Sequence, residues 1–223
     1  MKAAFDLTDR MKVPPLELSK FLLDEDHPIL ESKRKDLLAE AHPGPAAGTD
    51  HLWLDRHDAI IKGKGWDWPT LQAATRHMYA NPWYMRMPQR KREVLQHSLH
   101  RKNIGDRVHR ACTVDVSQNM GRVPMGLDGI CQTVTPKMDN WVIDRERCMM
   151  GVEALALQGF PVDWGLSLPE SVRPSDIIFK DLAGNAFTAT VFTAVYLSMW
   201  ATMPPRKSQE VEHAVEDIRR FMA

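Results

Sequence analysis

The nine histidines of this 223-residue chain are the first candidates for chemistry, because imidazole is a common metal ligand. His97 and His100 lie three residues apart on an expected helix, and His109 follows them. A metal site needs several ligands that converge, with neighbours that orient them, and no acidic residue stands at a matching spacing. We therefore expect no metal site and histidines that face solvent on a helix surface.

The one basic stretch of the chain, residues 88–110, is the candidate for nucleic-acid binding. The formal net charge of the whole chain is zero, so attraction to a polyanion must be local. Phosphate contacts need a local cluster of Lys and Arg, which positions DNA without reading its sequence. We expect weak, salt-dependent DNA binding through five residues, Arg90, Lys91, Arg92, Arg101 and Lys102. The alternative is a solvated helix face.

The three cysteines, Cys112, Cys131 and Cys148, have neither zinc-site nor redox spacing. Reduced thiols in an intracellular protein are the expected state. The N-terminus lacks the apolar core of a signal peptide. The most apolar stretch, residues 187–203, is interrupted by Thr and Ser and is too short for a membrane span, so we expect a buried helix and no membrane contact.

Two short stretches carry unusual turn chemistry. "LQGFPVDW", residues 157–164, places Phe160, Pro161 and Trp164 directly after a glycine that ends a helix. Such a turn either packs on another layer of protein or holds a ligand. In "DLAGNAF", residues 181–187, Gly184 and Asn185 fall between two expected helices. Asn185 there can cap the second helix, whose free N–H groups can meet a polar ligand.

The elements that position these residues are mostly helices. Short strands are expected at 112–117 and 140–144, where apolar and polar residues alternate or β-branched residues gather. Helices are expected at 16–23, 28–40, 52–62, from about 69, 88–103, 149–157, 175–182, 186–202 and 208–221. A boundary near residue 110 divides a helical region, 1–110, from a small mixed α/β region, 111–223, with an apolar C-terminal helix. The predicted fold class is α+β and predominantly helical.

"RCMMGVEALALQGFPVDW" followed by "SDIIFKDLAGNAFTATVFTAVYLSM" resembles the C-terminal end of DNA (cytosine-5) methyltransferases. Arg147, Glu153 and residues 157–161 match the family's "R-x-L-T-x-x-E-x-x-x-L-Q-G-F-P" motif. Residues 184–186 match its "Q-x-G-N-A/S-V" motif, although Phe187 stands where valine is usual. The resemblance is specific over residues 130–203.

The resemblance implies a role for each motif. The "LQGFP" turn organises the target-recognition region against the catalytic domain, with Phe160 and Pro161 as packing residues. The "GNA" motif helps to line the S-adenosylmethionine pocket, which makes Gly184, Asn185 and Ala186 the cofactor-binding residues. The fold implied is an incomplete methyltransferase fold without its cofactor-binding, Rossmann-like half.

The sequence departs from the family where the chemistry is done. It has no early Gly-rich strand–turn–helix, no Pro-Cys-Gln and no Glu-Asn-Val. Methylation at C5 needs a thiolate, an acid and a methyl donor around a flipped base, so we expect no catalytic residue in this chain. The resemblance therefore implies a C-terminal fragment or split subunit, nuclear if eukaryotic, that is inactive alone and uses S-adenosylmethionine only with a catalytic half. The alternative is a non-enzymatic DNA- or protein-binding module.

Partners follow from the same expectation. Large side chains lie almost all the way around the apolar C-terminal helix, and a helix of this kind needs neighbours on every side. We expect Phe192, Met199 and Trp200 to be exposed in the isolated chain unless the N-terminal helices or residues 211–221 cover them. A catalytic-half protein or self-association would then cover them.

Overall fold

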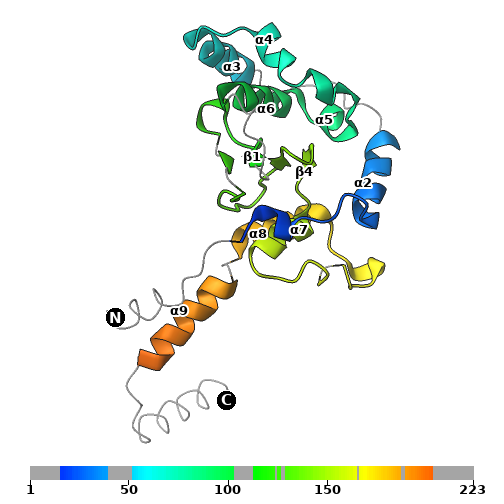
Figure 1. Ribbon diagram of the computed structural model, residues 1–223, viewed down its shortest axis with the longest axis vertical. Helices are drawn as coiled ribbons and strands as arrows, with labels where there is room; N and C mark the ends of the chain where they lie inside the picture. Colours follow the sequence, from blue (N-terminus) through cyan, green and yellow to red (C-terminus); the bar gives the residue numbers. More distant parts are fainter. Residues whose placement is uncertain are drawn as a thin grey trace, which may run out of the picture. The chain divides into compact units, whose positions relative to one another are not determined.

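A computed structural model describes residues 16–39, 52–102, 113–123, 125–126, 129–164, 166–186 and 189–202 of the chain (Figure 1). The chain divides into two compact units. The larger unit lies within Pro15–Thr188, and the smaller contributes one described helix, α9 (Ala189–Thr202). No helix among the described residues is long and apolar enough to cross a membrane.

Helices form the first part of the larger unit. Figure 1 shows α3 (Leu52–Gly63), α4 (Trp68–Ala73), α5 (Pro82–Arg86) and α6 (Gln89–Lys102) gathered at one end of this unit, with the strands between them and α7 (Gly151–Leu157) and α8 (Asp176–Asn185). Asn81 begins α5 by accepting hydrogen bonds from the N–H groups of Trp83 and Tyr84. The elements are η1 (Leu18–Phe21), α2 (Pro28–Ala39), α3 (Leu52–Gly63), α4 (Trp68–Ala73), η2 (Arg76–Ala80), α5 (Pro82–Arg86) and α6 (Gln89–Lys102). The helices predicted at 28–40, 52–62 and 88–103 are confirmed, whereas 16–23 is a single 3-10 turn.

A four-stranded antiparallel sheet, in the order β2-β1-β3-β4, follows the helices. Its strands are β1 (Thr113–Asp115), β2 (Met125–Gly126), β3 (Asn140–Val142) and β4 (Arg147–Cys148). Val114 pairs with Trp141 across the two central strands, and Trp141 with Cys148. The predicted strands at 112–117 and 140–144 are confirmed in β1 and β3. The two-residue strands β2 and β4 are too short to show an alternating pattern and were not predicted.

The remaining described elements of the larger unit are η4 (Met120–Arg122), α7 (Gly151–Leu157), η5 (Glu170–Val172) and α8 (Asp176–Asn185). Residues 151–156 of α7 are all buried, so this helix is surrounded by the rest of the unit. One hydrophobic core joins side chains of the helices, the sheet and α7, among them Tyr84, Leu95, Trp141 and Leu155. The α+β class is therefore confirmed. The predicted boundary near residue 110 falls outside the described residues and stays a prediction.

Two predictions about the C-terminal helices need correction. The helix predicted at 175–182 continues to Asn185, and the one predicted from 186 begins at Ala189. Residues 187–203 were expected to form a buried helix, but within its own unit α9 exposes almost all of its described side chains. Phe192, Met199 and Trp200 are exposed by 57%, 47% and 68%, as predicted. The predicted helix at 208–221 lies outside the described residues.

Candidate functional site

A buried ion pair joins Arg147 in β4 to Glu153 in α7. Arg147 is 1% exposed and Glu153 is fully buried. The two side chains form a bidentate pair, Nη1 to Oε2 at 2.9 Å and Nη2 to Oε1 at 2.8 Å. They are also the first two matched positions of the methyltransferase motif, six residues apart in sequence. The resemblance therefore falls on residues that contact one another directly.

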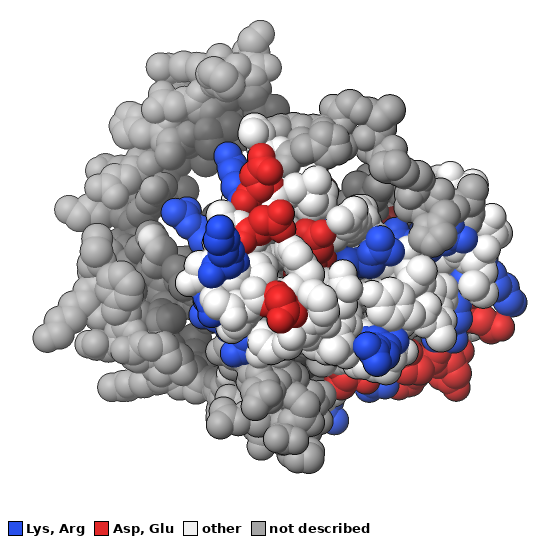
Figure 2. Space-filling model, turned by 90° about the horizontal axis from the view of Figure 1, so that it is seen from above, with Lys and Arg blue, Asp and Glu red and all other residues white. Residues whose placement is uncertain are grey.

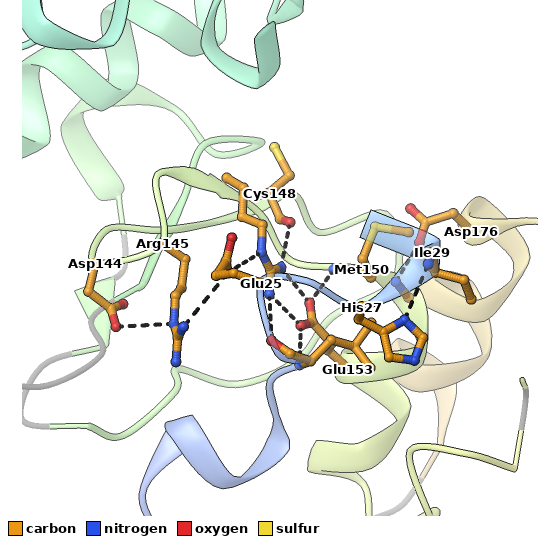
Figure 3. Close-up of polar contacts among 12 residues, drawn as sticks. Glu25, His27, Ile29, Asp144, Arg145, Cys148, Met150, Glu153 and Asp176 are labelled. Atoms are coloured by element: carbon orange, nitrogen blue, oxygen red, sulfur yellow. Dashed lines mark hydrogen bonds and ion pairs between the residues drawn. The ribbon is translucent and has the colours of Figure 1, made fainter. Parts of the chain in front are cut away.

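The same pair holds the segment that precedes α2. Glu153 Oε1 accepts the N–H of Leu23 at 2.7 Å, and Arg147 donates to the Leu23 carbonyl oxygen at 3.4 Å and to Glu25 Oε1 at 3.0 Å. Figure 3 shows Glu25 close to Met150 and Glu153, although Glu25 precedes α2 and the other two residues belong to the start of α7. No pattern in the sequence pointed to residues 23–25, because they are more than 120 residues away along the chain. The acidic stretch there reads only as a break between two helices.

The guanidinium of Arg147 is fully satisfied by this arrangement. With a further bond from Nη1 to the Cys148 carbonyl oxygen at 3.3 Å, five hydrogen bonds match its five N–H donors. Burial by itself would lower the pKa of Arg147, but its hydrogen bonds and ion pair with Glu153 outweigh burial, so the pKa is raised. Arg147 is therefore a permanent cation whose charge is paired with carboxylates inside the protein.

The start of α7 is capped from two sides. Glu153 Oε2 accepts the N–H of Met150 at 2.7 Å, and Asp176 Oδ1 of α8 accepts the N–H of Gly151 at 2.6 Å. Both carboxylates lie at the positive end of the helix dipole, where they are stabilising. A Cβ atom on Gly151 would lie 2.5 Å from the Asp176 carbonyl oxygen and from Phe179 Cβ, so glycine allows α7 and α8 to approach closely.

The "LQGFP" turn ends α7 with a Schellman motif. Gly159 has φ 91°, and its N–H donates to the Ala156 carbonyl oxygen at 2.9 Å. The N–H of Phe160 donates to the Leu155 carbonyl oxygen at 3.3 Å. Phe160 is half-buried against the core, with the Trp164 ring 5.6 Å from its own. Phe160 is a packing residue as predicted. Pro161 is exposed, so its prediction as a packing residue is wrong.

The "GNA" residues lie at the end of α8 rather than at the start of the apolar helix. Asn185 is the last residue of α8, and its Nδ2 donates to the Asp181 carbonyl oxygen at 2.9 Å. The prediction that Asn185 caps the following helix is therefore wrong, because α8 runs one turn further than expected. A Cβ on Gly184 would overlap the backbone of Thr135 and Pro136, so packing alone requires glycine there. The cofactor contact of Gly184, Asn185 and Ala186 stays a prediction.

The two cysteines with described environments are poor nucleophiles. Burial raises the pKa of the Cys131 thiol to about 11, and burial raises the pKa of the Cys148 thiol further. Both thiols are free and protonated at neutral pH, so neither has the lowered pKa of a catalytic cysteine. Cys112 lies outside the described residues.

Three of the five predicted DNA-binding residues contact the protein itself. Arg90 donates to the carbonyl oxygens of Ser117 and Gln118 at 3.3 and 3.2 Å, and Arg92 donates to a carbonyl oxygen of α5 at 3.3 Å. Lys91 Nζ lies 2.6 Å from Asp139 Oδ2. These three side chains are half-buried, so the alternative of a solvated helix face is wrong for them.

Of the other two predicted DNA-binding residues, Arg101 is exposed and the side chain of Lys102 lies outside the described part. The DNA-binding role of the five residues stays a prediction. Figure 2 shows Lys and Arg interspersed with Asp and Glu on the face seen from above. Basic residues do not form one continuous field there, so any attraction to DNA on this face is local.

His57 of α3 and His97 of α6 are buried, which corrects for them the expectation that histidines face solvent; His100 is half-buried and His109 lies outside the described residues. His57 Nδ1 lies 2.7 Å from Glu93 Oε2, and both side chains are buried. His97 is 1% exposed and neither of its ring nitrogens has a hydrogen-bond partner. Burial lowers the pKa of His97 to about 4, so its ring is neutral. Within the described ranges, no three His, Cys, Asp or Glu side chains are arranged to hold a metal ion.

Part of the chain is similar to two fungal enzymes. It is 34% identical over 135 residues to a Cryptococcus neoformans protein named DNA (cytosine-5-)-methyltransferase DMT5, covering 59% of this chain and 5% of that protein. It is 35% identical over 100 residues to the Verticillium dahliae protein of the same name, covering 45% of this chain and 4% of that protein. No protein-family profile matches the chain. The chain spans about one twentieth of these relatives' lengths and is related to DNA cytosine-5 methyltransferases over part of its own.

Proposed function

We propose that this chain is the C-terminal portion of a DNA cytosine-5 methyltransferase, which carries the target-recognition region and the "LQGFP" and "GNA" motifs. The observation that carries the proposal is the Arg147–Glu153 pair, which joins two matched motif residues in one buried contact. The similarity to the two fungal methyltransferases supports it independently. A nuclear location follows from this function in a eukaryote.

The pair's role in this proposal is to orient the recognition part. It fixes β4 and α7 to residues 23–25, directly before α2, while the Schellman motif fixes where the chain leaves α7. Every donor of Arg147 is satisfied within the protein, so the cluster has no charge left for substrate or cofactor. We therefore assign it a positioning function, with no part in the methyl-transfer chemistry.

The proposed partner is a catalytic-half polypeptide. Exposed apolar side chains on α8 support this proposal. Ile177, Ile178 and Leu182 are exposed by 75%, 51% and 47%, and Asn185 is exposed beside them on the same helix. Apolar side chains in such number on one helix mark an interface more often than a free surface. The partner would supply the nucleophilic cysteine, the acid and most of the cofactor pocket.

The three predicted cofactor residues fit S-adenosylmethionine unequally. The exposed carboxamide of Asn185 suits a hydrogen bond to a polar group of the cofactor. Gly184 is accounted for by its contact with Thr135 and Pro136. In the proposed complex Asn185 therefore makes the side-chain contact, and Gly184 holds α8 in place. The cofactor supplies the methyl group when it is bound.

The experiment that tests the function is a chimera. The stretch of the Cryptococcus neoformans methyltransferase that is similar to this chain is replaced by the corresponding residues of this chain, and transfer of labelled methyl groups to duplex DNA is measured. We expect activity in the chimera and none in the isolated chain, which lacks a Pro-Cys-Gln nucleophile. Asn185→Ala in the chimera should raise the KM for S-adenosylmethionine more than it changes kcat, whereas Asn119→Ala, at another exposed asparagine, should change neither.

Two results would contradict the proposal. A chimera that is folded by circular dichroism and yet transfers no methyl group would show that the two stretches are not equivalent. Methyl transfer by the isolated chain, lost on replacing one of its cysteines, would show that it carries its own catalytic site. DNA binding without any restored activity would favour the non-enzymatic binding module.

A further inference from the structure

The basic residues that are adjacent in the sequence are not the ones best placed in the structure to contact DNA. Arg90, Lys91 and Arg92 have their donors engaged inside the fold. Lys62, Lys64 and Arg101 are exposed, and none of their side chains makes an ion pair or hydrogen bond within the described part of the chain. An exposed cationic side chain that makes no ion pair or hydrogen bond can contact phosphate without breaking either kind of internal contact.

These three cations come from two helix ends that lie together. His57 of α3 contacts Glu93 of α6, and Trp66, just after α3, has its ring 5.5 Å from His97 and 4.7 Å from His100. The two helices therefore run in the same direction, side by side, as Figure 1 also shows. The C-terminal end of α3 with the turn after it lies beside the last turn of α6, which ends with His100, Arg101 and Lys102.

The turn after α3 explains why its lysines face outward. Gly65 has φ 66°, which glycine adopts without strain, and the N–H of Trp66 returns to the Ile61 carbonyl oxygen at 3.1 Å. This reversal directs Trp66 back onto α6 and leaves Lys62 and Lys64 exposed. Lys64 Nζ lies 5.0 Å from the centre of the Trp66 ring, a cation–π contact that holds it beside α6.

The nearest carboxylates along the chain already act as acceptors. Asp67 accepts the N–H of Thr70 at 2.7 Å and caps α4, and Asp58 accepts the indole N–H of Trp68 at 2.7 Å. Neither carboxylate pairs with any of the three cations. The group of Lys62, Lys64 and Arg101 thus keeps its positive charge for an external anion.

We propose that Lys62, Lys64 and Arg101 form a contact surface for the phosphate backbone of duplex DNA. The inference rests on the proposed function, which makes DNA the polyanion this chain meets. Trp66 packs against His97 and His100, so no aromatic face of this group is left for a base. Contacts to phosphate alone are sequence-independent and strongly salt-dependent.

The test compares two triple variants of the full chain with equal change in charge. The first replaces the surface: Lys62→Gln, Lys64→Gln and Arg101→Gln. The matched control removes three positive charges from η1 and α2 instead: Lys20→Gln, Lys33→Gln and Lys35→Gln. Fluorescence anisotropy with a labelled duplex gives the Kd of each protein as a function of salt. Each lost phosphate contact should reduce the slope of log K against log salt by about 0.9.

We expect the surface variant to bind roughly tenfold or more weakly at low salt, with a slope lower by about 2 to 3, and the control to bind within about twofold of wild type. Equal losses in both variants, no loss in the surface variant, or no binding by the wild type would each overturn the proposal. The chimera separates this surface from the proposed function. An active chimera with an unaffected surface variant means that only the surface is wrong, and an inactive folded chimera with the expected loss means that only the function is wrong.

Discussion

The two ends of the larger unit treat buried polar groups in opposite ways. Between β4 and α7, the buried Arg147 and Glu153 satisfy one another and the backbone around them. Between α3 and α6, His97 is equally buried, yet neither ring nitrogen has a partner. The first arrangement stabilises the folded state only as a complete set, whereas the second tolerates an unpaired polar group because a neutral imidazole costs less to bury than a charge.

The two ends should therefore lose stability for different reasons. The motif end should lose stability when any member of its ion-pair network is removed. The helical end should lose stability when the pH falls, because it buries the titratable ring of His97. Three predictions test the contrast and a fourth concerns the smaller unit; they are given from the largest expected effect to the smallest.

The largest effect is expected for Glu153→Ala. This change leaves Arg147 buried without its main partner and also removes the acceptor of the Leu23 and Met150 N–H groups. The free energy of unfolding should fall by about 3–5 kcal/mol, measured by urea denaturation. Glu31→Ala, whose exposed side chain pairs with Lys35 on the surface of α2, is the control and should cost less than about 1 kcal/mol. Similar losses in the two variants would mean that the buried pair is not special.

Acid should weaken the helical end through His97. Its pKa is about 4 in the folded state and 6.5 ordinarily, so between these values the unfolded state binds more protons. Stability should therefore fall by up to about 3 kcal/mol as the pH drops from 6.5 to 4, and this loss should level off below 4. His97→Phe should flatten the dependence over that window, whereas His77→Phe, at an exposed site, should not. The free energy of unfolding measured at several pH values decides between these outcomes.

Close backbone approach at the motif end should make Gly184→Ala destabilising. The new methyl group would overlap the backbone of Thr135 and Pro136, which cannot rotate away as a side chain can. A loss of about 1–3 kcal/mol is expected in thermal or urea unfolding. Gly63→Ala has nothing within 4 Å of the new methyl group and should be neutral or stabilising by up to about 1 kcal/mol. A neutral Gly184→Ala variant would remove the packing explanation for this glycine.

The smallest effect on stability is expected in the smaller unit. Phe192→Ser and Trp200→Ser change exposed side chains of α9 and should alter the free energy of unfolding by no more than about 0.5 kcal/mol. Self-association, measured by sedimentation at several concentrations, should nevertheless decrease, because the exposed apolar surface becomes smaller. A wild-type chain that stays monomeric at high concentration would contradict this expectation.

The sequence by itself determined the elements whose signals are local. Pro28 and Pro88 at helix starts located α2 and α6, the loop composition of residues 41–50 located the start of α3, and alternation or β-branched residues located β1 and β3. Gly159 predicted the end of α7, because a left-handed residue at that position is a property of the turn itself. Arg147, Glu153 and the "GNA" residues were selected by resemblance, which depends on the order of residues and not on their contacts.

Only the tertiary structure decided what those residues touch. Burial of His97 and the inward donors of Arg90, Lys91 and Arg92 depend on which face of α6 meets the rest of the protein. The partners of Glu153 at residues 23–25 lie about 130 residues away along the chain, so no local pattern contains them. Helix α8 ends at Asn185 and not at Leu182, where the sequence predicted its end before Gly184. Gly184 instead lies within the helix and packs against the backbone of Thr135 and Pro136. Contacts between distant segments set these outcomes, and helix propensity and periodicity carry no information about such contacts.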